Sequence, residues 1–224
     1  KAPPNLETNA SIMFFDLTIE VLLGRVIGLV IGFTLHEWAH AWSAYRLGDY
    51  TAYHQGRLTL DPRAHIDPMG IFLALIAGFG WAKPVPVNAR NFYPNEQRGL
   101  VIVALAGPVM NLIIGIAAGL FLSVLLAADF VNDFMFSVLA TIVIFNLVLF
   151  LFNLLPLAPL DGYRIAVGVL PSEQSQSMVR YERETTLILM LLLMLGLISN
   201  GRVNLLWTVL GPPLRFLYRT ILGF

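Results

Sequence analysis

The residues best suited to chemistry lie together in one short run, His36-Glu37-Trp38-Ala39-His40. If this run is helical, its two histidines project from the same face, one turn from each other. Both imidazoles can then bind a single Zn²⁺, and Glu37 can act as general base on an activated water. The alternative is a pair of structural histidines on an amphipathic helix. The apolar sequence around the run favours the zinc site, because three polar side chains in a membrane helix are expensive and need a purpose.

A hydrolytic zinc site uses three protein ligands and leaves one position open. We expect Asp161 to be the third ligand. It follows a long uncharged run, which should place it on the same side of a membrane as the end of the helix that carries His40. The site would then hold one Zn²⁺ per chain. The alternative role for Asp161 is an N-cap of a helix at residues 163–170.

Two asparagines in apolar runs are further candidates. Asn153 lies about two helical turns before Asp161, and its amide is a candidate catalytic donor to the oxyanion that develops during hydrolysis. Asn111 is a candidate substrate-binding residue, and its alternative is an interhelical hydrogen bond, the usual role of membrane asparagines. The other histidines, His54 and His65, lack a partner at ligand spacing, so we expect them to be solvated or packed in a loop.

The composition indicates what kind of protein must position these groups. Of 224 residues, 57% are apolar and only 12% are charged, which is about half the usual charged share of a globular protein. Such a chain is too apolar for a soluble domain or for disorder. Because 14 basic residues balance 14 acidic ones, nucleic-acid binding is also disfavoured. The absence of cysteine excludes thiolate catalysis and cysteine-ligated zinc.

Uncharged runs predict an all-α polytopic membrane protein with about four to five transmembrane helices. Runs without charge extend from Arg98 to Asp129 and from Asp133 to Asp161, and each exceeds the roughly 20 residues that a spanning helix needs. A third run, at 184–202, is just long enough. A less clean apolar segment covers residues 12–47. The last segment, 203–224, contains Gly211-Pro212-Pro213 and is expected to be a kinked span or an interfacial helix.

Between the first two long helices we expect a short membrane-associated structure. The apolar run 69–81 is too short to span and suits a re-entrant segment. Segments 57–60 and 85–88 alternate with period two, which predicts a small β-hairpin. An unwound substrate could add to its edge as a strand, making Leu58 and Val87 candidate substrate-binding residues. The alternative is a hairpin that only covers the site.

Basic residues concentrate in segments 46–98 and 161–184, which predicts that both segments are cytoplasmic and that the N-terminal side is outside. We expect a single domain over residues 1–224, with a core at about 12–170 and extra C-terminal helices at about 184–224.

Several motifs in order resemble the site-2 protease family of intramembrane zinc metalloproteases. The first is His36-Glu37-x-x-His40, and the last is Asn153-Leu-Leu-Pro156 leading to Pro159-Leu160-Asp161-Gly162. Between them, the segments 56–62, 65–68, 81–88 and 106–111 are similar to short bacterial members, and the resemblance covers roughly residues 20 to 170. We expect a short member of the family, without the PDZ insertion and the nucleotide-sensing domain of larger relatives.

The resemblance implies that His36, His40 and Asp161 bind zinc, that Glu37 is the base and that Asn153 assists. It further implies cleavage of transmembrane segments in membrane-anchored proteins during regulated intramembrane proteolysis. The expected partners are these substrates and the lipid bilayer, with no nucleic acid; the oligomeric state is left open. The expected location is the bacterial inner membrane, with the active site toward the cytoplasm.

Two other functions are weighed against this one. A channel or transporter with an intramembrane metal site would place carboxylates along the bilayer on several helices, and the central runs carry none. An inactive scaffold that binds transmembrane helices has no need of Glu37, which is intact here.

Overall fold

The structure is a computed structural model that describes residues 18–77, 80–199 and 204–223. Over these ranges it is helical and contains no β-strand, only one isolated β-bridge. Ten α-helices and one 3₁₀ turn follow one another along the described chain. They are α2 (Ile19–Arg46), α3 (Thr51–His54), α4 (Pro62–His65), α5 (Pro68–Ala77), the 3₁₀ turn η1 (Ala89–Asn91), α6 (Glu96–Ala127), α7 (Asp133–Asn153), α8 (Asp161–Val169), α9 (Ser172–Arg180), α10 (Glu182–Ile198) and α11 (Leu205–Leu222).

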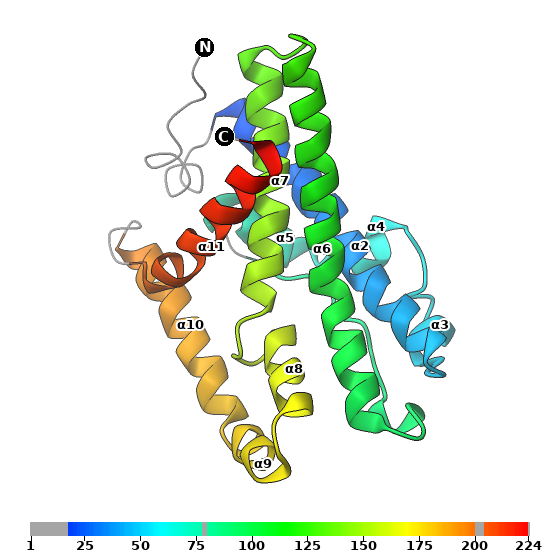
Figure 1. Cartoon of the computed structure of the whole chain (residues 1–224). Helices are drawn as coiled ribbons and strands as arrows, with labels where there is room; N and C mark the ends of the chain where they lie inside the picture. Colours follow the sequence, from blue (N-terminus) through cyan, green and yellow to red (C-terminus); the bar gives the residue numbers. More distant parts are fainter. Residues whose placement is uncertain (1–17, 78–79, 200–203, 224) are drawn as a thin grey trace.

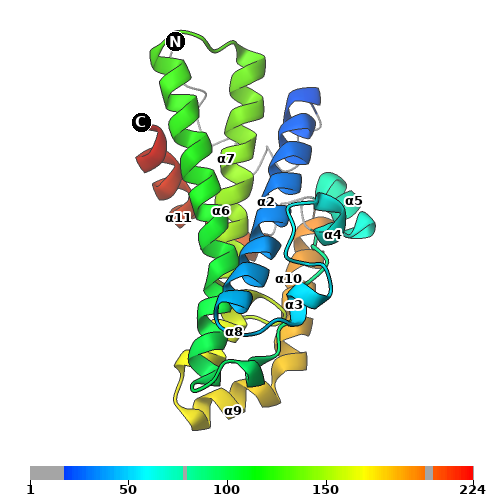
Figure 2. The ribbon, with the colours of Figure 1, turned by 90° about the vertical axis from the view of Figure 1, so that its right-hand side faces the viewer.

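Three long helices, α2, α6 and α7, form the centre of the molecule and pack against one another (Figures 1 and 2). They contain 28, 32 and 21 residues, and each is long and apolar enough to cross a membrane. The ends of the tight α6–α7 connection are well defined, because Asp129 takes a left-handed backbone conformation and Asn132 caps α7 by accepting from the Met135 N–H. The sequence prediction of a helical protein is confirmed for the described residues, and these three helices are candidate membrane spans by length and composition.

Glycines allow α2 to approach α7 closely. Gly24, Gly28 and Gly32 are spaced four residues apart on the buried face of α2. A Cβ added at Gly24 would lie 2.6 Å from the Thr141 Cβ, and one at Gly32 would lie 2.9 Å from the Asn146 Oδ1. This is the small-residue packing that membrane helices use. It brings the backbone carbonyls of α2 within reach of side chains on the other two helices.

The expectation of four to five spans is not supported. Among the described residues only α2, α6 and α7 meet the length and hydropathy required of a span. The expected span at 184–202 is α10, which has 17 residues and is about 25 Å long at 1.5 Å per residue, short of the roughly 30 Å hydrocarbon core. The final segment forms one helix, α11, which continues through Pro212 and Pro213.

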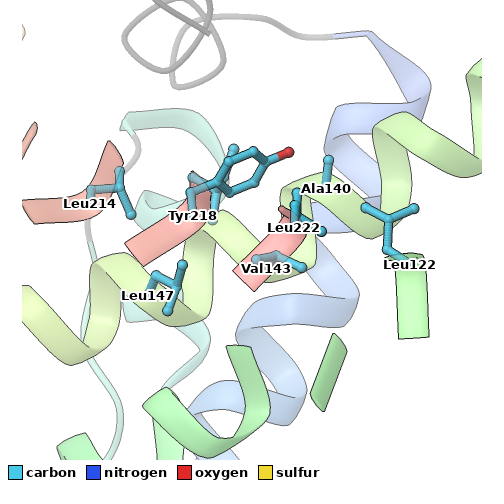
Figure 3. Packing of buried hydrophobic residues seen from close by; sticks show 8 residues of the cluster. Leu122, Ala140, Val143, Leu147, Leu214, Tyr218 and Leu222 are labelled. Carbon is cyan, nitrogen blue, oxygen red and sulfur yellow. The ribbon is translucent and has the colours of Figure 1, made fainter. Parts of the chain in front are cut away.

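The helix α11 packs across α7 by one face (Figure 1). Leu214, Tyr218 and Leu222 of α11 are buried against apolar residues of α6 and α7. Figure 3 shows this cluster, which includes Leu122, Ala140, Val143 and Leu147. The helix also carries Arg215 and Arg219. The helix is therefore amphipathic, with one apolar face on the bundle. Because of its polar residues this segment, although 18 residues long, does not have the hydropathy of a span.

The segment around α5 returns to the point from which it leaves. Ile66, before α5, forms an antiparallel bridge with Ala82, after it, and the Lys83 N–H donates to the His65 carbonyl at 2.7 Å. With 10 residues, α5 is about 15 Å long, half of the hydrocarbon core. This geometry agrees with a re-entrant segment.

A buried arginine fixes the C-terminal end of α5. The Arg25 side chain is fully buried, donates its Nη1 to the Leu75 carbonyl at 2.9 Å and lies over the Phe145 ring. Carbonyl groups at the end of a helix need donors, and apolar surroundings provide no water for this purpose. The positive charge of Arg25 also suits the negative end of the α5 dipole. Arg25 therefore attaches α5 to α2.

The predicted β-hairpin is wrong. Neither 57–60 nor 85–88 is a strand, although both run without helical structure. Two of the residues that could have formed the ladder, Pro84 and Pro86, carry no N–H. The Val85 N–H donates to the side chain of Glu37, and the Lys83 carbonyl accepts from the side chain of Arg57. Side chains thus take the backbone groups that a hairpin would have paired.

We expect a disulfide to form between cysteines placed at Ile66 and Ala82. Facing residues of an antiparallel pair have Cα atoms roughly 4.5–5.5 Å apart, which is within the disulfide range. The native chain has no cysteine, so oxidation of Ile66→Cys/Ala82→Cys can be followed by gel mobility after cleavage between the two positions. The control pair is Ile66→Cys/Ser123→Cys, in which Ser123 lies near the far end of α6. Absence of the crosslink in the first pair would show that the two ends of the α5 segment are separate.

Candidate metal centre

Three side chains from two helices meet in one buried cluster. His36 and His40 come from α2, and Asp161 is the first residue of α8. The two Nε2 atoms are 3.0 Å apart, and the Asp161 Oδ2 lies 3.1 Å from that of His36 and 3.2 Å from that of His40. All three residues are less than 9% exposed. Ligand atoms that converge in this way could hold one metal ion.

Each imidazole is oriented by a bond from its other nitrogen. The His40 Nδ1 lies 2.7 Å from the Val103 carbonyl, and the His36 Nδ1 lies 2.6 Å from the Asn111 Oδ1. Oxygens of these kinds only accept, so each Nδ1 must carry the hydrogen. In each ring Nε2 is then the nitrogen that can bind a metal, and both Nε2 atoms face the Asp161 Oδ2. This arrangement, with a fixed tautomer and a ligand nitrogen that is free to bind, is typical of metal-binding histidines.

Gly107 of α6 leaves space next to the ligand nitrogens. A Cβ added there would lie 2.4 Å from the His40 Nε2 and 2.6 Å from the His36 Nε2. No real side chain tolerates such contacts, so the space beside both nitrogens depends on the absence of a side chain at this position. The neighbouring Pro108 lacks an N–H and removes a hydrogen bond from the same part of the helix. The donor set and this space together fit Zn²⁺, which favours histidine nitrogen and carboxylate oxygen.

The residues that precede α8 position Asp161. The chain turns between α7 and α8, and a Cβ added at Gly162 would lie 2.4 Å from the carbonyl groups of Leu154 and Leu155. This close contact presses the start of α8 against the end of α7. Burial acts to raise the pKa of Asp161, but the neighbouring His40 and His36 outweigh it and hold the pKa well below its usual range. Asp161 is therefore an ionised carboxylate, as a metal ligand must be.

The Glu37 side chain contacts the segment at residues 83–88, which we call the cover segment. Glu37 is 8% exposed, and its Oε2 accepts the Val85 N–H at 2.9 Å. The cover segment is also held at both ends, because Lys83 N–H donates to the His65 carbonyl at 2.7 Å and Asn88 N–H donates to the Asp49 Oδ2 at 2.8 Å. The base is thus buried beneath a strip of chain that is attached on either side.

Two charged residues, Arg57 and Asp49, form hydrogen bonds with the backbone of the cover segment. Burial lowers the pKa of Arg57, and the Glu37 carboxylate opposes this change, so the two charged groups act on each other. Burial also acts to raise the pKa of Asp49, but hydrogen bonds from Thr51, Asn88 and Asn91 outweigh it and lower the pKa. Asp49 therefore remains an anion that accepts from both η1 and the cover segment.

The remaining predicted residues lie in different surroundings. The Asn111 side chain is fully buried and forms hydrogen bonds between helices, to His36 and Gly32 of α2 and to Asn146 of α7. Asn153 is the last residue of α7, and its Nδ2 donates to the Leu149 carbonyl of the same helix at 2.9 Å. Its role as an oxyanion donor stays a prediction.

The two proposed substrate contacts, Leu58 and Val87, are partly buried and both pack against a small core formed by Ala41, Ala52 and Val85. Their contact with a substrate also stays a prediction. As expected, His54 is exposed among tyrosines. His65 is not solvated or in a loop: it is the last residue of the short helix α4 and is fully buried, with its Nε2 2.8 Å from the Thr59 carbonyl.

Sequence reasoning missed Gly107, Asn146 and the Val85 N–H. An asparagine in the middle of the uncharged 133–161 run was a visible signal for Asn146, whereas the backbone group of Val85 has no sequence signature.

We expect Gly107→Ala to abolish zinc binding without unfolding the protein. The wild type should carry about one zinc per chain, as a mononuclear site does. The added methyl group occupies the space beside both Nε2 atoms, so zinc content should fall to that of the reference variant His36→Ala/His40→Ala. Metal analysis of purified protein measures this. The matched control is Gly211→Ala in α11, where the nearest heavy atom would be 4.0 Å away. Full zinc content in Gly107→Ala, or in the double histidine variant, would contradict the site.

Comparison with known proteins agrees with this chemistry. Over 208 residues the chain is 45% identical to a Bacillus subtilis (strain 168) protein named "Putative zinc metalloprotease YwhC", covering 89% of this chain and 90% of the relative. Over 180 residues it is 31% identical to Rip2 of Mycobacterium tuberculosis (strain H37Rv), which carries the same descriptive name, covering 79% of this chain and 68% of the relative. No family model matches the chain, and no solved structure gives a significant match. The identity and coverage show that the chain belongs to the family of zinc metalloproteases that includes YwhC and Rip2.

Proposed function

We propose that this protein is a zinc-dependent intramembrane endopeptidase of the site-2 protease type, which cleaves transmembrane segments of membrane-anchored proteins. One observation carries the proposal. Two members of the buried cluster, His36 and His40, lie on α2, a helix that is itself long and apolar enough to cross a membrane, and Glu37 is next to the first of them. The relatives' names support a metalloprotease, and the position on α2 supports cleavage within the membrane.

The chemistry divides between the metal and the chain. His36, His40 and Asp161 would hold the zinc ion, which would supply Lewis acidity and lower the pKa of a water. Glu37 accepts a proton from this water as the water oxygen attacks the scissile carbonyl carbon. When the C–N bond breaks, Glu37 returns the proton to the leaving amine. The His36 and His40 rings keep their Nδ1 hydrogens throughout, because Asn111 and the Val103 carbonyl hold them.

The substrate has to be unwound before it is cut. A transmembrane helix hides its peptide groups in its own hydrogen bonds, and in lipid each unpaired group costs several kcal/mol. Glu37 and the metal ligands are almost completely buried, so an extended substrate must also pass the cover segment. An ion path is less well supported, since the long runs in α6 and α7 carry no charge.

We expect Glu37→Gln to lose cleavage while it keeps zinc. Gln still accepts the Val85 N–H, so the local structure should persist, but it cannot take a proton. A general base contributes about 10²–10⁴-fold, so cleaved fragment should fall by that factor. The measurement is co-expression with a panel of tagged single-span proteins, followed by immunoblotting for fragments and by metal analysis. Glu20→Gln, near the start of the same helix, is the control. Unchanged fragment in Glu37→Gln would exclude this residue as the base.

The proposed orientation places the active site toward the cytoplasm of the bacterial inner membrane. The basic content of 46–98 and 161–184 supports this placement, since cytoplasmic loops carry excess Lys and Arg. The paired ends of the α5 segment support it as well, because a segment that returns to its start leaves both flanks on one side.

Single cysteines near Arg63 and near Gln176 should therefore give the same labelling. A membrane-impermeant thiol reagent applied to intact cells should leave both unlabelled, and lysis should expose both. The unmodified chain gives no background because it contains no cysteine. Opposite labelling of the two positions would mean that the α5 segment crosses the bilayer, and the orientation would be wrong.

A further inference from the structure

The side chain of Asn146 lies at the centre of α7 and is fully buried. A buried amide is expensive unless its donors and its acceptor are all used. Its Nδ2 lies 3.0 Å from the Ile142 carbonyl and 3.4 Å from the Gly28 carbonyl of α2. Its Oδ1 accepts from the Asn111 Nδ2 at 3.3 Å. Asn146 therefore joins three helices through one amide group.

These partners fix the orientation of both amides. Carbonyl oxygens only accept, so the amide nitrogen of Asn146 must face Ile142 and Gly28, and its oxygen must face Asn111. The Asn111 nitrogen then has two acceptors, the Asn146 Oδ1 and the Gly32 carbonyl at 3.2 Å. Its oxygen is left for the His36 Nδ1 at 2.6 Å. The hydrogen bonds run in one direction, from the imidazole to the carbonyl groups of α2 and α7.

The direction of this chain decides which nitrogen of His36 can bind a metal. An Asn111 oxygen at Nδ1 requires the hydrogen there and leaves Nε2 as the nitrogen that can bind a metal. If the Asn111 amide were reversed, its nitrogen would face Nδ1 and favour the tautomer with hydrogen on Nε2, which cannot be a ligand. Gly32 alone accepts one of the two Asn111 hydrogens, and Asn146 accepts the other. Asn146 therefore adds to the preference for the ligand-competent tautomer.

We propose that Asn146 is a positioning residue for the metal centre, which acts through Asn111 to keep the His36 Nε2 free for zinc. The inference rests on the proposed zinc site. Asn146 does not contact the metal ligands, so its effect must pass through the amide of Asn111. Glycines at positions 28 and 32 make the arrangement possible, because a Cβ at Gly32 would lie 2.9 Å from the Asn146 Oδ1.

The first test compares zinc affinity in Asn146→Leu and Thr141→Val by competition with a chelator. Leu has a similar size but cannot accept from Asn111, and mutation of groups that orient a metal ligand typically weakens binding about 10–100-fold. We expect a loss of about tenfold for Asn146→Leu, because it acts one residue further from the metal. Thr141→Val is the matched control, since it also removes a buried polar group from the α2–α7 contact without a link to His36. Equal affinity in the two variants would overturn the proposal.

A second background separates positioning from a structural role. In Asn111→Asp the group facing His36 is a carboxylate, which accepts from Nδ1 in either orientation. Asn146→Leu should therefore cost at most about twofold in zinc affinity in that background, a coupling that a double-mutant cycle measures. If Asn146→Leu lost as much zinc affinity in the Asn111→Asp protein as in the otherwise wild-type protein, Asn146 would act only through packing.

A third measurement needs no variant that might fail to fold. The chain has four histidines, so ¹⁵N spectra of the zinc-loaded protein can be assigned to individual residues. The proposal requires zinc on the His36 Nε2 and hydrogen on its Nδ1 in the wild type, and zinc on Nδ1 would overturn it. If the wild type bound no zinc, the proposed function would fail. If it bound zinc and Asn146→Leu bound it equally well, only the inference would fail.

Discussion

A polar side chain buried between apolar helices must find its hydrogen-bonding partners inside the protein, because neither lipid nor packed hydrocarbon supplies them. Where α2, α6 and α7 meet, this constraint determines the site. His36, Asn111 and Asn146 lie there in a row that ends on backbone carbonyls. Because these carbonyls can only accept, the amides cannot reverse without leaving their present partners unpaired. The ligand geometry is therefore imposed by the helix packing.

The same constraint explains where the glycines lie. Backbone carbonyls of α2 are within reach of Asn111 and Asn146 because Gly28 and Gly32 carry no side chain on the buried face. Gly107 leaves the corresponding space on the α6 side, beside the ligand nitrogens. The contacts that hold the three helices together are thus also the contacts that position the ligands. A metal bound only by the folded arrangement would in turn stabilise that packing.

The sequence was informative where a single element or a simple rule of sidedness decides the outcome. The spacing of His36 and His40 needs only one helix, and Asp161 followed from which side of a membrane each run ends on. The β-hairpin failed because alternation in 85–88 reveals an extended backbone without revealing its partner, which is the side chain of Glu37. The span count failed because the apolarity of 184–202 does not fix the length of α10. The role of Asn146 depends on the register of three helices, which no local pattern contains.

The bond between Glu37 and the Val85 N–H has a consequence for activity if the protein cleaves peptides as proposed. The Val85 N–H occupies one of the acceptor sites of the Glu37 carboxylate, so loosening of this contact during the reaction would make both oxygens fully available to the attacking water. The anchors at His65 and Asp49 lie at the two ends of the segment and involve neither the base nor the ligands. The middle can therefore shift while the ends stay in place. The Val85 N–H released in this step lies beside the base, and an unwound substrate arrives with backbone carbonyls that need donors. The same group that covers the base in the free protein is thus available to the substrate that displaces it.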